Sequence, residues 1–231
     1  MTVTQSNADF LQHVPRPFRD RREAGRLLAP LLRHYAGRND VVVLALPRGG
    51  VPIAYEVAVA IGAPLDVFTV RKLGVPGHEE FAMGAIASGG ASVLDEGVIA
   101  GLGISHNEVV RITEQERQEL ERREHLYRDH RTYPELDGKI VILVDDGIAT
   151  GASMLVAVSA LRKKDPAKII VAIPVAPVDS CALLRKYADE LICYSTPERF
   201  GGVGAWYEDF SQVSDDEVRT LLNQASLRRA S

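Results

Sequence analysis

Two adjacent carboxylates, Asp145 and Asp146, follow a run of apolar and β-branched residues, and a turn with glycine and hydroxyl side chains comes next. This pattern predicts a buried parallel strand, a tight turn and the N-terminus of a helix. Backbone N–H groups at a helix N-terminus bind anions, and the helix dipole adds to the attraction. Because carboxylates repel a bare phosphate, they suit a ligand that also offers hydroxyls, or a magnesium ion that bridges the two. A sugar phosphate has this pattern of charges.

The turn itself consists of Ala149, Thr150, Gly151, Ala152 and Ser153. It lacks the Gly-Lys-Ser/Thr of a Walker A loop and the Gly-x-Gly-x-x-Gly of a dinucleotide site. The alternative is an ordinary strand–turn–helix with incidental aspartates. That alternative is disfavoured because paired aspartates at a strand end are costly without a ligand or partner.

A second candidate segment is Arg48-Gly49-Gly50, which follows a predicted strand at 41–46. Arginine can bind a phosphate with two parallel hydrogen bonds, and glycine lets backbone approach a ligand closely. A turn after a strand needs glycine in any case, so the motif alone is weak. Its place at the carboxyl end of a parallel strand, where ligands bind in open α/β sheets, strengthens it.

A third segment begins at Arg71-Lys72 and continues through residues 73–82, which are rich in Gly and Pro and include Glu79 and Glu80. Such a segment suits a loop that closes over a ligand, and Glu79 or Glu80 is a candidate proton acceptor. A plain surface hairpin is the alternative.

A fourth segment, residues 200–210, places the only tryptophan, Trp206, beside Tyr207 in a glycine-rich stretch. A flat aromatic face suits stacking on a base. Equally, Trp206 could seal a small core under the C-terminal helix.

Strands and helices alternate along the chain, which predicts an α/β fold with a mostly parallel central sheet and helices on both faces. In a long helix at 105–128, opposite charges recur at helical spacing, as in Glu119 with Arg123 and Glu124 with Arg128. We expect this helix to be a solvated surface helix in preference to a specific partner site. The predicted strands are 41–46, 65–71, 83–88, 91–94, 140–145, 168–174 and 190–194.

The chain of 231 residues is 46% hydrophobic and 25% charged, which suffices for one substantial core. Its net charge of −4 argues against nucleic-acid binding as the main function. No apolar run is long enough for a bilayer, and no leader precedes the chain, so we expect a cytoplasmic protein without membrane partners. Cys181 and Cys193 are expected to be buried thiols in a reducing compartment.

Residues 144–153 resemble the phosphoribosyl-pyrophosphate (PRPP) signature of type I phosphoribosyltransferases, in the form Asp-Asp-x-x-Ala-Thr-Gly-x-Ser/Thr. Arg48-Gly49-Gly50 resembles the pyrophosphate loop of that family, and Arg71-Lys72 the start of its mobile lid. The resemblance covers about residues 38–210. It implies one domain over 1–231, with a charged helical insertion at about 104–130 and a hood formed by the N- and C-terminal segments.

The resemblance also implies roles. Residues Ala149 to Ser153 would bind the 5-phosphate, Asp145 and Asp146 the ribose hydroxyls, and Arg48, Gly49 and Gly50 the pyrophosphate. Arg71 or Lys72 would neutralise the leaving group, while Trp206 and Tyr207 would contact a base. Mg²⁺ would be held mainly through PRPP, with Asp145 and Asp146 contributing through water. A cis peptide at Pro47–Arg48 and a homodimer are further expectations.

The implied reaction transfers the 5-phosphoribosyl group to a nitrogen nucleophile, a nucleobase by preference, with release of pyrophosphate. Hypoxanthine-type enzymes carry an acidic residue where Ala149 lies, so that substrate class is in doubt, and the pattern fits a bacterial subgroup of unassigned substrate. Two other functions remain open. One is a non-catalytic PRPP or nucleotide sensor, and the other is a phosphohydrolase of PRPP or a nucleotide.

Overall fold

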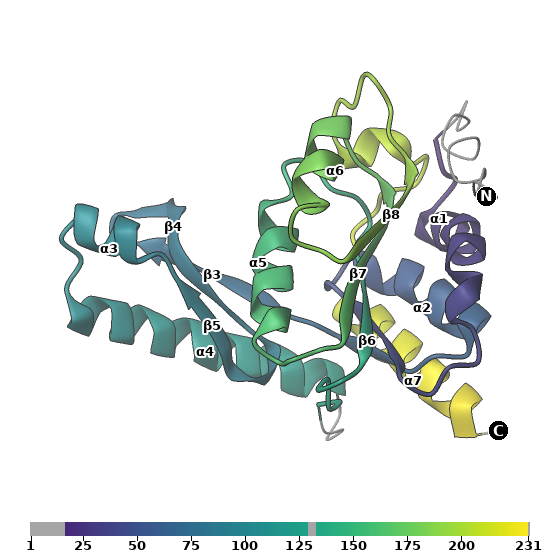
Figure 1. Ribbon diagram of the computed structural model, residues 1–231, viewed down its shortest axis with the longest axis horizontal. Helices are drawn as coiled ribbons and strands as arrows, with labels where there is room; N and C mark the ends of the chain where they lie inside the picture. Colours follow the sequence, from purple (N-terminus) through teal and green to yellow (C-terminus); the bar gives the residue numbers. More distant parts are fainter. Residues whose placement is uncertain (1–16, 129–132, 231) are drawn as a thin grey trace, which may run out of the picture.

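The computed structural model describes residues 17–128 and 133–230, without the side chains of residues 79, 80, 229 and 230. Five strands form a parallel sheet in the order β2-β1-β6-β7-β8 (Figure 1). This arrangement confirms the predicted α/β class with a mostly parallel central sheet. The strands are β1 (Val41–Ala45), β2 (Leu65–Val67), β6 (Ile140–Val144), β7 (Lys168–Val175) and β8 (Glu190–Ser195).

Alternate residues of each strand pack against opposite layers of helices. In β1, Val41, Val43 and Ala45 belong to one core, whereas Val42 and Leu44 belong to the other. This division follows from the two-residue period of a strand. Figure 1 shows helices on both sides of the sheet. On one side lie α1 (Arg21–Leu28), η2 (Ala29–Tyr35), α2 (Gly50–Ile61) and α7 (Asp215–Ala230), and on the other lie α5 (Ala152–Arg162) and α6 (Val178–Leu184).

The chain between β2 and β6 forms an arm, residues 70–128, that projects from the central sheet (Figure 1). Leu73, Met83 and Ile86 of its antiparallel sheet pack with Val109 and Leu120 of α4 in a core of their own. The arm is therefore a folded extension with its own core. Its elements are β3 (Val70–Val75), β4 (His78–Ala87), η3 (Ser88–Gly90), β5 (Ala91–Leu94), α3 (Glu96–Gly101) and α4 (His106–Arg128).

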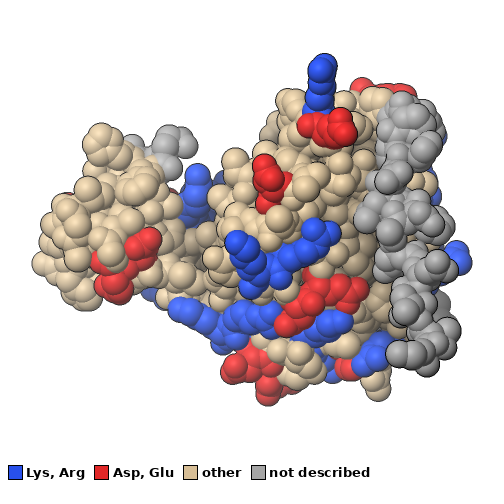
Figure 2. Space-filling model, turned by 45° about the horizontal axis from the view of Figure 1, so that its top comes forward, with Lys and Arg blue, Asp and Glu red and all other residues tan. Residues whose placement is uncertain are grey.

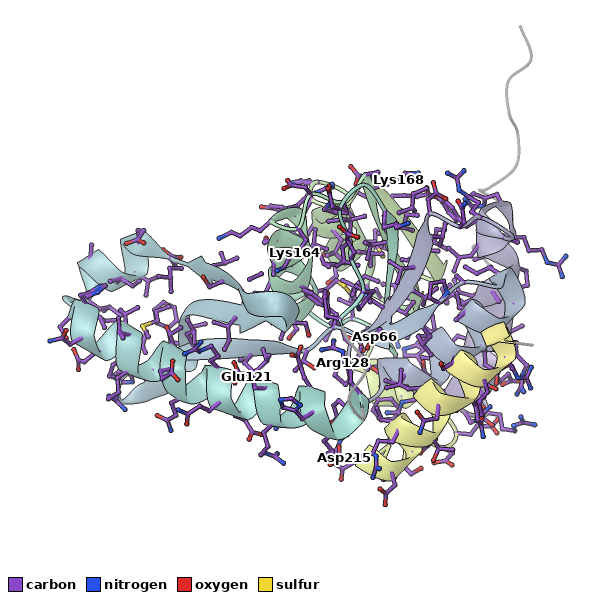
Figure 3. All side chains as sticks on the ribbon, turned by 90° about the horizontal axis from the view of Figure 1, so that it is seen from below. Asp66, Glu121, Arg128, Lys164, Lys168 and Asp215 are labelled. Carbon is purple, nitrogen blue, oxygen red and sulfur yellow. The ribbon has the colours of Figure 1, made fainter. Side chains whose placement is uncertain are left out.

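A buried arginine fastens the arm to the central sheet. Arg128, the last residue of α4, places Nε 3.0 Å from Oδ1 of Asp66 and donates from Nη2 to the carbonyl of Val67 at 2.8 Å. Figure 3 shows Arg128 directed toward Asp66 where the arm meets the body. Because both charges are largely buried, this ion pair fixes where α4 ends relative to β2.

The C-terminal end of α5 also contacts the arm. Lys163 and Lys164, which follow the helix, donate through their ammonium groups to the carbonyl oxygens of Ser92 and Gly89. The same helix begins at Ala152, directly after the loop that follows β6. One helix therefore runs from that loop to the arm.

The structure corrects two expectations for residues 65–82. The predicted strand 65–71 is split, because β2 ends at Val67 and β3 begins at Val70. Residues 73–82, expected to be a loop, mostly form a β-hairpin, in which the turn covers only Pro76 and Gly77. Burial of apolar side chains from this segment against α4 explains the hairpin, since each such residue gains contacts that a solvated loop would lack.

The long helix matches its predicted bounds closely. Its two expected ion pairs are confirmed, with Arg123 2.8 Å from Glu119 and Arg128 3.1 Å from Glu124. Only one face is charged and solvated, because apolar residues on the other face cover the sheet of the arm. The amphipathic spacing of those residues therefore explains how α4 is positioned.

The N-terminal end of the described chain is paired with residues 206–209. Phe18 donates its N–H to the carbonyl of Trp206 at 2.8 Å, and Glu208 donates to the carbonyl of Phe18 at 2.7 Å. Directly afterwards α1 begins, where the side chain of Asp20 accepts from the N–H of Glu23 at 2.7 Å. Asp20 is therefore the N-cap of α1. The segment before α1 is thus paired with the residues that follow η4 (Val203–Trp206).

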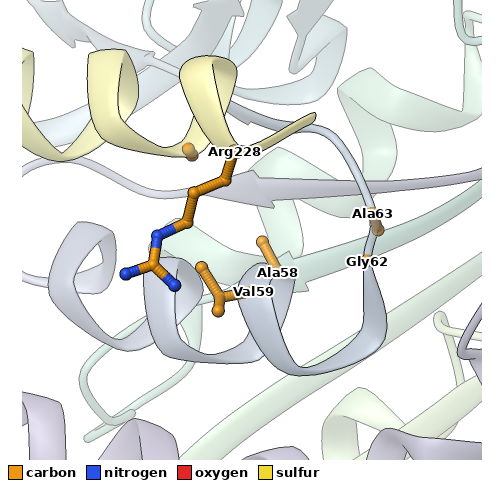
Figure 4. Close-up of a pocket in the computed structure, with 6 residues that line it drawn as sticks. Ala58, Val59, Gly62, Ala63 and Arg228 are labelled. Carbon is orange, nitrogen blue, oxygen red and sulfur yellow. The ribbon is translucent and has the colours of Figure 1, made fainter. Parts of the chain in front are cut away.

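A groove of about 300 Å³ lies between the end of α2 and α7 (Figure 4). The 12 residues of α2 make it about 18 Å long, so this groove is far from the loop at the start of α2. The groove is lined by Ala58, Val59, Gly62, Ala63, Ala225 and Arg228.

No helix in the described ranges is long and apolar enough to cross a membrane.

Candidate functional site

The loops after β1 and β6 lie against each other at the carboxyl edge of the sheet. The two strands are neighbours, with Ala45 opposite Val144. A Cβ atom on Gly50 would lie 2.7 Å from the carbonyl oxygen of Val144, and one on Gly49 would lie 2.0 Å from Oδ2 of Asp146. Only glycine permits this approach. The fold therefore brings together two segments that are about 100 residues apart in the sequence.

Asp145 and Asp146 are adjacent and mostly buried. The N–H of Asp146 donates to Oδ1 of Asp145 at 2.8 Å. Burial raises the pKa of Asp145 well above its ordinary value, and the charge of Asp146 raises it further. Burial likewise raises the pKa of Asp146, although Arg21 opposes this shift. The pair therefore holds poorly solvated negative charge, which a cation or a hydroxyl-bearing ligand would stabilise.

The turn after the carboxylates leaves a helix N-terminus open. Gly151, at φ 82°, is the N-cap of α5 and makes no side-chain capping bond. The N–H of Ala152 lies 3.5 Å from Oγ1 of Thr150, which is long for a hydrogen bond. Thr150, Ala152 and Ser153 are exposed, as is Ala149. The first amides of α5 are thus available to an anion.

Contacts beneath this turn hold its backbone in place. Ile148 is buried and donates its N–H to the carbonyl of Val175 at 3.0 Å. Ser180, near the start of α6, donates its hydroxyl to the carbonyl of Ala149 at 2.5 Å. Sequence reasoning missed Ser180, because nothing in the local pattern of α6 distinguishes it from any helix-start serine.

Arg48 lies at the same edge of the sheet, between β1 and α2. Its Nη1 is 3.6 Å from Oδ1 of Asp215, the first residue of α7, and Asp215 also accepts from the hydroxyl of Tyr127 at 2.7 Å. The long distance leaves the guanidinium only loosely held. The Pro47–Arg48 peptide bond is cis, as expected from the resemblance.

The remaining charged candidates lie in the arm. In β3, Arg71 donates from Nε to Oε2 of Glu116 at 2.7 Å, so its guanidinium is paired with α4. Lys72 is exposed and, as the next residue of the strand, lies on the opposite face. The backbones of Glu79 and Glu80 belong to β4, while their side chains lie outside the described part of the chain.

The two aromatic candidates differ in their surroundings. Trp206 is partly buried against the main core and donates from Nε1 to the carbonyl of Phe200 at 2.8 Å. Tyr207 is buried, with its ring 5.4 Å from Phe18, and its hydroxyl donates to the carbonyl of Asp146 at 2.5 Å. Burial and the nearby aspartate raise the pKa of Tyr207, so the phenol remains a donor. Its observed link to the site is therefore this hydroxyl.

Arg21 is a site residue that sequence reasoning missed. Its Nε lies 2.9 Å from Oδ2 of Asp146, and its Nη1 donates to the carbonyl of Ser211 at 2.8 Å. The local sequence offers only Asp20 and Glu23, a pair typical of a helix start. That signal locates the helix but does not reveal which distant residue its first side chain meets.

The donor set for a metal ion is small. Within residues 17–128 and 133–230, no group of three or more His, Cys, Asp or Glu side chains is placed to hold a metal. Asp145 and Asp146 offer two carboxylates, and Asp146 already contacts Arg21. Two carboxylates suit Mg²⁺, which commonly keeps several waters and binds substrate phosphates instead of a full protein cage.

Comparison with known proteins identifies the family. A family model described as the phosphoribosyl transferase domain matches residues 20–208. Proteins from two strains of Mycobacterium tuberculosis, provisionally named phosphoribosyl transferases, are 45% identical over 208 residues, which is 90% of this chain and 47% of theirs. The chain thus spans about half the length of these relatives.

A solved structure has the same fold. The crystal structure of the protein TT1426 from Thermus thermophilus is 42% identical, with a TM-score of 0.79 over 90% of this chain and 98% of that one. The two chains thus share both their fold and a clear similarity in sequence. The chain belongs to the type I phosphoribosyl transferase family, with an unassigned substrate.

Proposed function

We propose that the chain transfers the 5-phosphoribosyl group of PRPP to a nitrogen nucleophile of the nucleobase class and releases pyrophosphate. One observation supports this proposal above others. The loop of Arg48, Gly49 and Gly50 lies directly against Asp146, and the open N-terminus of α5 begins a few residues further on. Two places for phosphate groups thus flank a pair of carboxylates, which matches the charges and hydroxyls of PRPP.

The 5-phosphate would bind to residues Ala149 to Ser153. Backbone N–H groups of the first turn of α5 would donate to the phosphate, and the hydroxyls of Thr150 and Ser153 would add hydrogen bonds. The bond from Ser180 to the carbonyl of Ala149 orients that turn before the ligand arrives. Preorganised donors of this kind cost little reorganisation during a reaction.

The carboxylates would act on the ribose. Departure of pyrophosphate from the anomeric carbon gives a transition state with oxocarbenium character, so positioning and charge stabilisation would dominate catalysis. Asp145 and Asp146 would accept hydrogen bonds from the ribose hydroxyls and stabilise positive charge on the sugar. Their buried setting strengthens such interactions, because the local dielectric constant is low.

The pyrophosphate would lie on Arg48, Gly49 and Gly50. Mg²⁺ would be carried mainly by PRPP, with Asp145 and Asp146 contributing through water, and would neutralise charge on the leaving group. Figure 2 turns the upper edge of Figure 1 toward the reader and shows Lys and Arg side chains over the middle of this face, with Asp and Glu among them. Both signs of charge are therefore present there.

Residues outside the sheet edge would complete the reaction. Arg71 or Lys72 would neutralise the departing pyrophosphate, which for Arg71 requires release from Glu116. Glu79 or Glu80 would accept the proton of the nucleophile. Trp206 would contact the base more readily than Tyr207, because the ring of Tyr207 is buried.

A sensor or a phosphohydrolase would also bind PRPP, so turnover must be measured. Labelled PRPP and Mg²⁺ are incubated with the chain and a panel of nucleobases and amines, and the products are separated. Base-dependent release of pyrophosphate with formation of a nucleotide supports the transferase. Binding of PRPP without turnover indicates a sensor, and release of phosphate or pyrophosphate without any base indicates a hydrolase. A chain that does not bind PRPP refutes the transferase, the PRPP sensor and the PRPP hydrolase.

Two further properties belong to this proposal. Cys181 and Cys193 are free and buried, which suits a reducing compartment such as the cytoplasm. A homodimer is the proposed assembly, and light scattering at several concentrations tests it.

A further inference from the structure

The side chain of Arg21 is held at three points and is only 10% exposed. Its Nε meets Asp146 at 2.9 Å, its Nη1 meets the carbonyl of Ser211 at 2.8 Å, and its guanidinium lies 4.0 Å from the ring centre of Phe210. A surface ion pair is seldom fixed from several directions. The side chain of Arg21 is therefore fixed in one orientation. The function proposed above gives it no role.

Its partner is equally constrained. Asp146 donates its N–H to Asp145, accepts the hydroxyl of Tyr207 at its carbonyl, and meets Arg21 at its carboxylate. A Cβ atom on Gly49 would lie 2.0 Å from Oδ2 of Asp146 and 3.4 Å from Nε of Arg21. The guanidinium, the carboxylate and the pyrophosphate loop thus converge at one place.

We infer that Arg21 is a positioning residue of the transfer reaction, which fixes the carboxylate of Asp146 against the pyrophosphate loop. The inference rests on the proposed function. Oδ1 of Asp145 accepts the backbone N–H of Asp146, while Oδ2 of Asp146 meets Arg21, so the two adjacent carboxylates are held by different partners. Without Arg21, repulsion between the adjacent carboxylates would favour rotation of Asp146 away from its neighbour.

The position of Arg21 in the chain also links the site to the packing of the segment before α1. Arg21 is the first residue of α1, and the segment before it is paired with residues 206–209, next to Ser211 and Phe210. The segment that leads into α1 and residues 206–211 therefore together set the orientation of one carboxylate. Correct packing of these segments would be required for a fully active site.

Three variants test the inference. Arg21→Gln removes the charge, Arg21→Lys keeps the charge but not the planar pair of donors, and Arg22→Gln is the matched control. Arg22 is the next residue of α1, and its ion pair with Glu56 is 41% exposed on the arginine side. We expect Arg21→Gln to lower kcat for pyrophosphate release about tenfold to a hundredfold, with a smaller change in KM for PRPP. Arg21→Lys should be intermediate, and Arg22→Gln should resemble the wild type.

A double-mutant cycle shows whether Arg21 acts through Asp146. In an Asp146→Asn background, Arg21→Gln should change kcat less than about threefold, because the carboxylate that it positions is already gone. Multiplicative effects would overturn the inference. So would an Arg21→Gln variant that loses thermal stability but keeps wild-type kcat per folded molecule. If Arg21→Gln does not fold, the same cycle is measured with Arg21→Lys.

The two proposals fail in different ways. A wild-type chain that neither binds PRPP nor turns it over refutes the proposed function. If the wild type binds PRPP without turnover, the cycle is measured on the Kd for PRPP, where additive effects again overturn the role of Arg21. A wild type that is active while Arg21→Gln is unchanged refutes only the inference about Arg21.

Discussion

Gly49 lies so close to Asp146 that a methyl group on its Cα would overlap the carboxylate, with the added carbon 2.0 Å from Oδ2 and 2.7 Å from Cγ. The backbone of Gly49 has φ −60°, which alanine adopts without strain. Gly49→Ala should therefore act only through this overlap. We expect it to lower the affinity for PRPP at least about tenfold and to lower the melting temperature, measured by titration calorimetry and thermal unfolding.

Gly101→Ala is the matched control for this variant, since a Cβ there meets no atom within 4 Å. It should leave PRPP binding unchanged. Adding Asp146→Ala to Gly49→Ala should restore the melting temperature without restoring binding. If Gly49→Ala alone binds PRPP normally, the close packing of these two loops does not matter for the ligand.

The raised pKa of Asp145 predicts how stability depends on pH. A carboxyl in the unfolded chain has a pKa of about 3.9, whereas burial and Asp146 raise that of Asp145 in the folded protein. The folded state therefore binds the proton more tightly, and Asp145 weakens folding as the pH rises above about 4. We expect Asp145→Asn to melt higher than the wild type at about pH 7, without PRPP or Mg²⁺, with the difference closing toward pH 4. A lower melting temperature for Asp145→Asn at neutral pH would contradict this reading.

The same carboxylates should matter for turnover. Asp145→Asn and Asp146→Asn keep the shape of each side chain and remove its charge. Loss of one charge-assisted hydrogen bond costs about 1.5–3 kcal/mol, so each variant should lower PRPP turnover about tenfold to a few hundredfold. Steady-state kinetics and melting temperatures are measured on the same preparations. Reduced stability with intact PRPP binding would instead make the pair a structural turn.

Tyr207→Phe should remove the hydrogen bond from the hydroxyl of Tyr207 to the carbonyl of Asp146. The lost hydroxyl leaves a part-buried carbonyl without its 2.5 Å partner, which costs about 1–3 kcal/mol of unfolding free energy. Urea denaturation measures this loss. Tyr187→Phe, at an exposed tyrosine, should be close to neutral. Equal stability of the two variants would show that the hydroxyl of Tyr207 is dispensable.

Arg128→Met tests how the arm is fastened. The substitution removes the guanidinium that forms the ion pair with Asp66, and breaking a buried pair of this kind costs about 3–5 kcal/mol. Hydrogen exchange should then speed up in the last turn of α4 and in β2. Arg122→Met, on the solvated face of the same helix, should change neither quantity. If hydrogen exchange rises in the central sheet but not in the last turn of α4, Arg128 stabilises the sheet and does not fasten the arm to it.

The central sheet and the position of the two main loops could be predicted, because the signals were local. Continuous apolar runs mark buried parallel strands, and the residues that follow such runs must lie at the carboxyl edge. The distance between Gly49 and Asp146 could not be predicted, since it depends on which strands are neighbours. The contact of Arg21 with Asp146 could not be predicted for the same reason, since the two residues are 125 positions apart.

The hairpin of the arm could not be predicted from the sequence for a different reason. Gly74, Pro76 and Gly77 are turn-forming residues, and on local grounds they indicate a loop. The burial of Leu73 and Met83 against α4 overrides that preference, but it appears only once this helix, which begins at His106, is placed beside the strands. Propensity was thus outweighed by tertiary packing.

Helix α5 connects the arm to the turn of residues 149–153. The helix starts at that turn, and the two lysines after its last residue grip the carbonyls of Ser92 and Gly89 in the arm. Its 11 residues form a stiff rod about 16 Å long. Because α5 is stiff, a displacement of the arm would also displace the first turn of α5. The turn of residues 149–153 and the arm therefore lie at opposite ends of one helix.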